Sequence, residues 1–169
     1  MEGLVRNPVE AIAIGMIFTS FFIVENRNLR YSAYAYTAQS TLLVAVFLAV
    51  AYWLGEHHFY VWAATATVTK VIIVPLLILW AVRKAMVEVE SPPLIGLPFS
   101  LLVESLIIAL SFYTVLYALH VPSAAERFKL CLAVSFILFF IGVYGMMSRR
   151  CAVKQSICLC HMENGVHLM

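Results

Sequence analysis

Long apolar stretches separated by short polar connections limit what this sequence can fold into. A helix needs roughly 20 apolar residues to cross a hydrocarbon core about 30 Å thick. Five stretches approach or reach this length, at residues 8–24, 31–53, 59–82, 99–119 and 127–147. A sixth, residues 155–169, would rise only about 22 Å as a helix and is too short to cross, so we expect the natural chain to continue. The pattern predicts an all-α, polytopic transmembrane bundle in one integral membrane domain, with five spans and a partial sixth.

The composition agrees with a membrane protein and argues against several other classes. Hydrophobic residues make up 63% of the chain and charged residues 12%, with a mean hydropathy of +0.94. A soluble domain is about 45–50% apolar and about 25% charged. The net charge of +2 is far below what nucleic-acid binding requires, so we expect no nucleic-acid partner. The 4 cysteines match no standard zinc or iron–sulfur spacing, and we expect no metal or other cofactor in this chain.

Lysine and arginine are distributed unequally between the two ends of the predicted helices. One end carries Arg27, Arg30, Arg83, Lys84, Arg149, Arg150 and Lys154. The other end carries Arg6, Arg127 and Lys129. Because basic residues concentrate on the cytoplasmic side of membrane proteins, we expect the first end in the cytoplasm and the N-terminus outside. The predicted location is the cytoplasmic (inner) membrane of the cell.

Lys70 is the most unusual residue, because it lies close to the centre of the predicted span 59–82. A charge at that depth costs about 3 kcal/mol on insertion scales, so such a lysine usually faces a partner or water. Pro75 follows five residues later and weakens the backbone hydrogen bonding. Two interpretations remain open: Lys70 relays protons or ions, or it fixes helix packing through one carboxylate.

Four further polar residues are candidates for the same relay. Glu163 and His167 are four residues apart and so share a helix face, unless their segment never enters the membrane. Glu104, about 8 Å below the start of its span, either takes up protons or reaches headgroup water. Gln39, at a depth similar to that of Lys70, either hydrogen-bonds it or joins two helices. We expect no catalytic residues, because the sequence has no nucleophile elbow and no phosphate-binding glycine loop.

Two motifs resemble the hydrogenase-4 component E family. The first is the stretch 61–76 around Lys70, with Gln39-Ser40 in the preceding helix, and the second is the ending 158–168, with Met-Glu-Asn-Gly followed by His167. Members of that family are membrane subunits of formate hydrogenlyase-type and related membrane-bound nickel–iron hydrogenase complexes. Each half of the family is similar to the small K-type subunit of complex I, which would account for a faint internal repeat. The glutamates that help conduct protons in that subunit are replaced in the first half here by Gln39 and Lys70.

The resemblance implies a subunit that is not an enzyme by itself but belongs to an oxidoreductase complex. It would contribute to proton translocation or anchor the membrane arm. Its partners would be antiporter-like and quinone-site-like membrane subunits and the hydrogenase large and small subunits, which would hold the nickel–iron centre and the iron–sulfur clusters. Two alternatives are a small subunit of a multi-subunit cation/proton antiporter and a purely structural lateral subunit.

Overall fold

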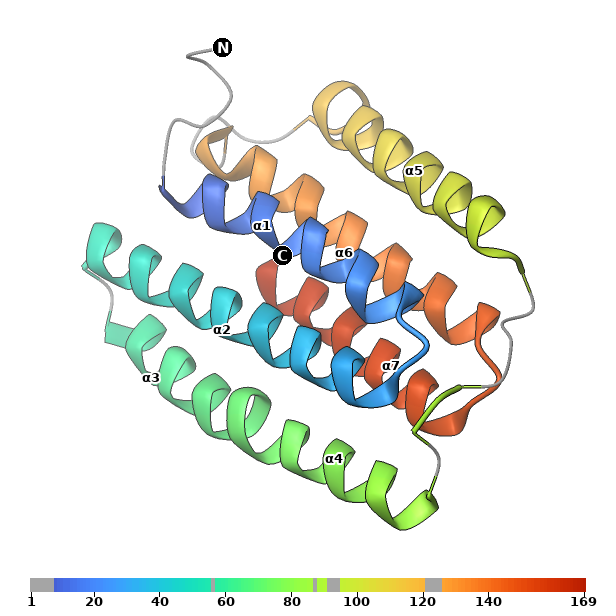
Figure 1. Cartoon of the computed structure of the whole chain (residues 1–169). Coiled ribbons are helices and arrows are strands. Elements are labelled where there is room, and N and C mark those ends of the chain that lie inside the picture. Colours follow the sequence, from blue (N-terminus) through green and yellow to red (C-terminus); the bar gives the residue numbers. More distant parts are fainter. Residues whose placement is uncertain (1–7, 56, 87, 91–94, 121–125) are drawn as a thin grey trace.

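The computed structural model describes residues 8–55, 57–86, 88–90, 95–120 and 126–169 (Figure 1). Regular structure in these ranges is helical, apart from one β-bridge between Asn28 and Val89. The helices are α1 (Pro8–Glu25), α2 (Leu29–Leu54), α3 (His57–Ala66), the π-helix η1 (Thr67–Ile73), α4 (Val74–Ala85), α5 (Leu97–Tyr113), the π-helix η2 (Thr114–Ala118), the 3₁₀-helix η3 (Glu126–Phe128), α6 (Lys129–Ser148) and α7 (Ala152–Leu168). Segments α3, η1 and α4 follow one another without a break, as do α5 and η2.

The predicted all-α membrane bundle is confirmed. Among the described residues, 4 helical segments are long and apolar enough to cross a membrane: Leu29–Trp53, His57–Ala85, Leu97–Ala118 and Lys129–Ser148. Helix α1, which is not one of these four segments, is 18 residues long and ends at Glu25. The last helix, α7, begins at Ala152 rather than at residue 155, directly after the extended residue Cys151 (φ −80°, ψ 123°).

Helices α1, α2, α6 and α7 form the centre of the bundle. Helix α1 packs against α2 and α6, and α7 packs against α6, α2 and α1. Fully buried apolar side chains from three of these helices, Met16, Leu43 and Leu138, belong to one core cluster. Helix α5 packs against α6, whereas α3, η1 and α4 pack against α2, so α5 and the α3–α4 segment lie on opposite sides of the bundle (Figure 1).

Two helical hairpins of similar form lie at the centre. Residues 26–28 connect α1 to α2, and residues 149–151 connect α6 to α7. Backbone hydrogen bonds from Leu29 to Glu88 and from Glu90 to Arg27 hold the segment after α4 against the first connection. We call this end of the bundle, which carries the seven basic residues of the first group above, the basic end. Arg6, which was counted for the opposite end, lies outside the described residues.

The helix widens around Lys70. Residues Thr67–Ile73 form a π-helix, whose hydrogen bonds reach back five residues instead of four. Pro75 has no amide hydrogen, and in a regular α-helix its ring would clash with the carbonyl group of Val71. The wider turn before Pro75 avoids this clash, and it places Lys70 in the middle of an irregular segment of the kind that is frequent at functional sites.

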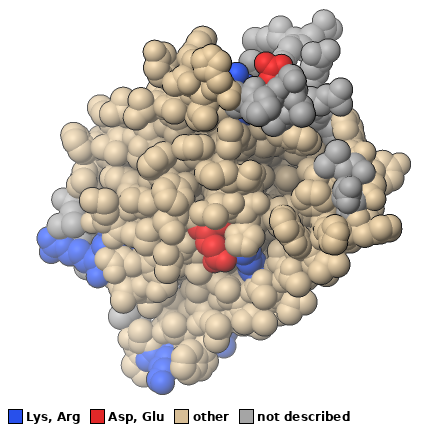
Figure 2. Space-filling model, turned by 180° about the vertical axis from the view of Figure 1, so that it is seen from behind, with Lys and Arg blue, Asp and Glu red and all other residues tan. Residues whose placement is uncertain are grey.

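The surface of the bundle is largely apolar. Figure 2 shows one face on which charged side chains lie mainly near the edges, apart from one acidic group beside a basic one near the middle. Helix α5 exposes a row of large hydrophobic side chains: Phe99, Leu102, Leu106, Leu110 and Tyr113. Such a surface is suited to contact with lipid or with other membrane helices.

Candidate functional site

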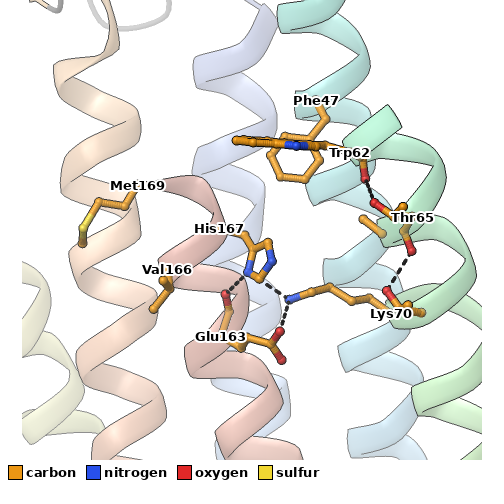
Figure 3. A pocket seen from close by; sticks show the side chains of 10 residues that line it. Phe47, Trp62, Thr65, Lys70, Glu163, Val166, His167 and Met169 are labelled. Carbon is orange, nitrogen blue, oxygen red and sulfur yellow. Dashed lines mark hydrogen bonds and ion pairs between the residues drawn. The ribbon is translucent and has the colours of Figure 1, made fainter. Parts of the chain in front are cut away.

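Lys70 is buried near the middle of the helical segment His57–Ala85 and is 5% exposed. Its ammonium group meets three acceptors, all on α7, of which Glu163 and His167 are drawn in Figure 3. They are Oδ1 of Asn164 at 3.0 Å, Nδ1 of His167 at 3.3 Å and Oε1 of Glu163 at 3.4 Å. An ammonium group has three hydrogens, so these three acceptors can satisfy all of them.

The Nδ1 atom of His167 has two neighbours and can form a hydrogen bond with only one of them at a time. It lies 3.3 Å from Nζ of Lys70 and 2.9 Å from the backbone oxygen of Glu163, one turn earlier. Without a hydrogen, Nδ1 accepts a bond from Lys70; with a hydrogen, it donates to the carbonyl oxygen. A proton on this atom therefore leaves the Lys70 ammonium with two acceptors instead of three.

A chain of buried polar side chains continues from Asn164 into the bundle. The Nδ2 atom of Asn164 donates to Oε1 of Gln39 at 3.3 Å and to Oγ of Ser40 at 3.2 Å. Nδ1 of His161 lies 2.7 Å from the same Gln39 oxygen and so carries the hydrogen. Nε2 of Gln39 donates to Oγ of Ser20 at 3.1 Å. All five side chains are fully buried, and together they join α7, α2 and α1.

The outer side of the site opens into a surface pocket of about 670 Å³ (Figure 3). Besides the charged groups, the pocket is lined by Phe47, Trp62, Thr65, Thr69, Val166 and Met169. The side chain of Glu163 is 53% exposed here, whereas that of Lys70 is 6% exposed. Lys70 therefore lies between the exposed carboxylate of Glu163, on the side of the pocket, and the buried polar side chains that begin at Asn164.

The structure brings together four of the five predicted relay residues. Lys70, Glu163 and His167 are in direct contact, and Gln39 is connected to Lys70 through Asn164 rather than directly. Glu104 lies elsewhere, because α5 packs on the side of the bundle away from α4 (Figure 1). Within the described residues, Glu104 makes no hydrogen bond to the other four.

The sequence prediction missed most of the buried polar chain. The set of candidate residues did not include Asn164, His161, Ser40 and Ser20. His161 and Asn164 are three residues apart and so lie on one helix face, which was a usable signal. Ser20 gave no such signal, because a serine in a transmembrane helix commonly bonds its own backbone, as Ser20 also does to Met16.

Lys154 is a second buried lysine, at the basic end. Its Nζ atom donates to the carbonyl oxygens of Ile23 at 2.5 Å and Asn26 at 2.7 Å and to Oγ of Ser32 at 2.7 Å. The last carbonyl groups of a helix have no partner within it, so Lys154 caps the end of α1. The sequence had placed Lys154 among the basic residues of this end without indicating that it is fully buried.

In the described residues, no three His, Cys or Glu side chains are arranged to hold a metal ion.

The fold and this site define a class: a multi-pass α-helical membrane protein that holds a lysine–glutamate pair within a transmembrane bundle. Hydrogenase-4 component E of Escherichia coli (strain K12) is 31% identical over 154 residues, which cover 91% of this chain and 70% of that protein. The same values hold for hydrogenase-4 component E of Escherichia coli O157:H7 and of Shigella flexneri. The chain therefore belongs to the hydrogenase-4 component E family, as its two motifs indicated.

A second comparison concerns the C-terminal hairpin. The family model for NADH-ubiquinone/plastoquinone oxidoreductase chain 4L matches residues 130–169, which span α6 and α7. This region contains the three α7 acceptors of Lys70. No solved structure matches the chain significantly.

Proposed function

We propose that this chain is a non-catalytic membrane subunit of a complex I-like hydrogenase complex, and that its Lys70 site takes part in proton translocation. Support for the first part comes from membership in a family named for a hydrogenase component and from the match of α6 and α7 to oxidoreductase chain 4L. The hydrogenase partners would hold the nickel–iron centre and the iron–sulfur clusters. By the positive-inside rule, the basic end would face the cytoplasm and the N-terminus the outside of the cell membrane.

The observation that carries the second part is the contact of Lys70 with two titratable groups. Nζ of Lys70 lies within 3.4 Å of both Nδ1 of His167 and Oε1 of Glu163, so a proton can pass between these atoms when the contacts shorten slightly or through one water molecule. The amides of Asn164 and Gln39 do not titrate; they hold the lysine and α7 in place. Redox-linked charge movement in partner subunits would change which of the three groups holds the proton.

The open side of the site indicates where a partner would bind. A half-exposed carboxylate on an apolar membrane surface costs a few kcal/mol if it faces lipid. A neighbouring membrane subunit that covers the pocket and hydrogen-bonds Glu163 would remove this cost. We place an antiporter-like subunit here, because such a neighbour would receive the proton that leaves Glu163 or His167.

The test compares Lys70→Met with Lys70→Arg and with Lys84→Met, a control at the exposed lysine over the Trp80 ring. Each complex is purified through a tag on this chain, its subunits are identified, and its hydrogen-linked proton uptake is measured in proteoliposomes. We expect Lys70→Met to keep the complex and its hydrogenase activity but to lose proton translocation on the order of a hundredfold. The control should match the wild type.

Three other outcomes contradict the proposal. Normal translocation in an intact Lys70→Met complex would exclude a relay through this residue. Weakened assembly of Lys70→Met, with normal coupling in the complexes that survive, would favour the purely structural subunit. Co-purification of antiporter subunits without any hydrogenase subunit would favour the cation/proton antiporter.

A further inference from the structure

A second group of buried charges lies at the basic end, apart from Lys70. Glu25, the last residue of α1, accepts a hydrogen bond from Oγ of Ser100 on α5, and Ser100 in turn accepts one from the hydroxyl group of Tyr144 at 2.7 Å. Arg149 reaches the other oxygen of Glu25 at 3.1 Å, and its second nitrogen lies 3.7 Å from Oε2 of Glu90. The group therefore joins α1, α5 and α6 to the connection 149–151 and to the segment after α4.

Among the described acids of this end, Glu104 is the one that has neither an ion pair nor a hydrogen bond from a donor group. Its side chain is fully buried, and neither carboxyl oxygen has a hydrogen-bond partner among the described residues. Glu104 follows Ser100 by one helical turn, and both are buried residues of α5. Because Ser100 donates to Glu25, this spacing places the Glu104 carboxyl group beside that of Glu25. Arg149 and Lys154 lie within electrostatic range of Glu104, as does Cys158 on α7. A buried, unbonded carboxylate beside a second carboxylate is an unfavourable arrangement in its ionised form.

The nearby cations face other partners, although the buried Nε atom of Arg149 has no hydrogen-bond partner among the described residues. The two terminal nitrogens of Arg149 face Glu25 and Glu90, and Lys154 donates to two carbonyl oxygens and a hydroxyl group. Arg149 thus pairs with Glu25 and Glu90, whereas neither Arg149 nor Lys154 forms an ion pair with Glu104. A proton is the smallest species that neutralises such a carboxyl without a new cavity.

The group also has an access route. A surface pocket of about 310 Å³ is lined by Phe21, Phe22, Glu25, Asn26 and Leu101. Glu25 therefore touches the surface at this end, while Glu104 lies fully buried behind it. A proton that enters through this pocket meets Glu25 first.

We propose that Glu25 and Glu104 form a proton-binding site at the basic end, in which the two carboxyl groups share one exchangeable proton that enters through the pocket at Glu25. Ser100 and Tyr144 position Glu25, and Arg149 holds it at the end of α1. This site goes beyond the proposed function, because its proton binding requires neither the Lys70 site nor hydrogenase turnover.

The test measures infrared absorption of the complex containing the full chain in nanodiscs of zwitterionic phosphatidylcholine, which has no net charge, as a function of pH. A protonated carboxyl group has a C=O stretching band that an ionised one lacks. We expect such a band near neutral pH, its loss in Glu104→Gln, and a change in Glu25→Gln of the pH at which it titrates. The matched control is Glu88→Gln, which removes an exposed carboxylate of the same end, paired with Arg30 at 2.5 Å, and should leave the band unchanged.

Further arms decide between the outcomes. If Glu104→Gln does not fold, Glu104→Asp keeps the carboxyl group and should keep the band at a shifted frequency. A band that survives both Glu104→Gln and Glu25→Gln, or no band at all, would overturn the proposal. Loss of the band when sodium replaces choline at constant pH would overturn it in favour of a metal-cation site. Lys70→Met should leave the band unchanged, so failure of either proposal does not decide the other.

Discussion

Lys70 and Glu163 form an ion pair in which one partner is buried and the other is open to the surface. Their Nζ and Oε1 atoms lie 3.4 Å apart, and their side chains are 6% and 53% exposed. The lysine belongs to the π-helix η1 and the glutamate to α7, so the pair joins the two halves of the chain. Such a pair connects a buried charge with the surface pocket without exposing the lysine itself.

Removing only the carboxylate of Glu163 should lower the free energy of unfolding more than removing both charges of the Lys70–Glu163 pair. We expect Glu163→Gln to lower the free energy of unfolding by about 1–3 kcal/mol, because it leaves the buried ammonium of Lys70 without its counter-ion. The double variant Lys70→Met/Glu163→Gln should lose less than this, since no charge stays uncompensated. Thermal unfolding of both variants in the same detergent checks the order, and a double variant less stable than the single one would contradict it.

Pro75 should determine where Lys70 points. We expect Pro75→Ala to let η1 return to a regular α-helix, because alanine supplies an amide hydrogen and removes the ring. A π-helical segment contains one residue more than the α-helix that would replace it. Its return to an α-helix therefore rotates the preceding side chains by about 100° around the helix axis, which moves Lys70 away from Glu163. Cross-linking of Lys70→Cys to Glu163→Cys by a bifunctional thiol reagent, in a chain without the native cysteines, should fall several-fold in Pro75→Ala. The control is Pro98→Ala in the first turn of α5, which should not change it.

Gly142 should tolerate no side chain where α6 meets α7. A Cβ atom at this position would lie 2.8 Å from the backbone N and Cα atoms of Met162. We expect Gly142→Ala to destabilise the bundle by about 1–3 kcal/mol, because two helix backbones must move apart. Gly15→Ala is the matched control, since its Cβ would meet only Leu42 at 3.8 Å. Equal thermal stability of the two variants would contradict this contact.

Lys154 should be needed for the end of α1 rather than for proton transfer. Lys154→Met leaves the carbonyl groups of Ile23 and Asn26 buried without their donor, which should cost about 1–3 kcal/mol. We expect a lower midpoint of thermal unfolding and no change in proton translocation per hydrogen turned over. Lys84→Met, an exposed lysine, should cost about 0.5 kcal/mol. A coupling defect in stable Lys154→Met complexes would contradict this assignment.

The sequence predicted the features that depend on local periodicity. It did not predict the features that depend on contacts with residues far away in the chain. Helical spans and the shared face of Glu163 and His167 follow from spacing along one chain. The π-helix around Lys70 was not predicted, although Pro75 indicated weak hydrogen bonding there. Whether a helix absorbs a proline by kinking or by widening depends on what its neighbours allow.

The environments of the charged residues were harder to predict. Lys154 resembled any basic residue at a helix start, and its burial depends on the end of α1, far away in the sequence. Glu104 was assigned to the same relay as Lys70 because both are polar residues in spans. Its place beside Glu25 follows only from the tertiary packing of α5, in which Ser100, one turn before Glu104, contacts Glu25.

The two exclusive bonds of His167 Nδ1 have a mechanical consequence. When a proton reaches that nitrogen, the ring turns its hydrogen toward the carbonyl oxygen of Glu163, and one of the three contacts that hold the Lys70 side chain is lost. In the proposed relay, the lysine would then be freer to change rotamer toward the pocket. Arrival of a proton at a single atom would thereby become movement of a long side chain, and the movement would reverse when the proton departs.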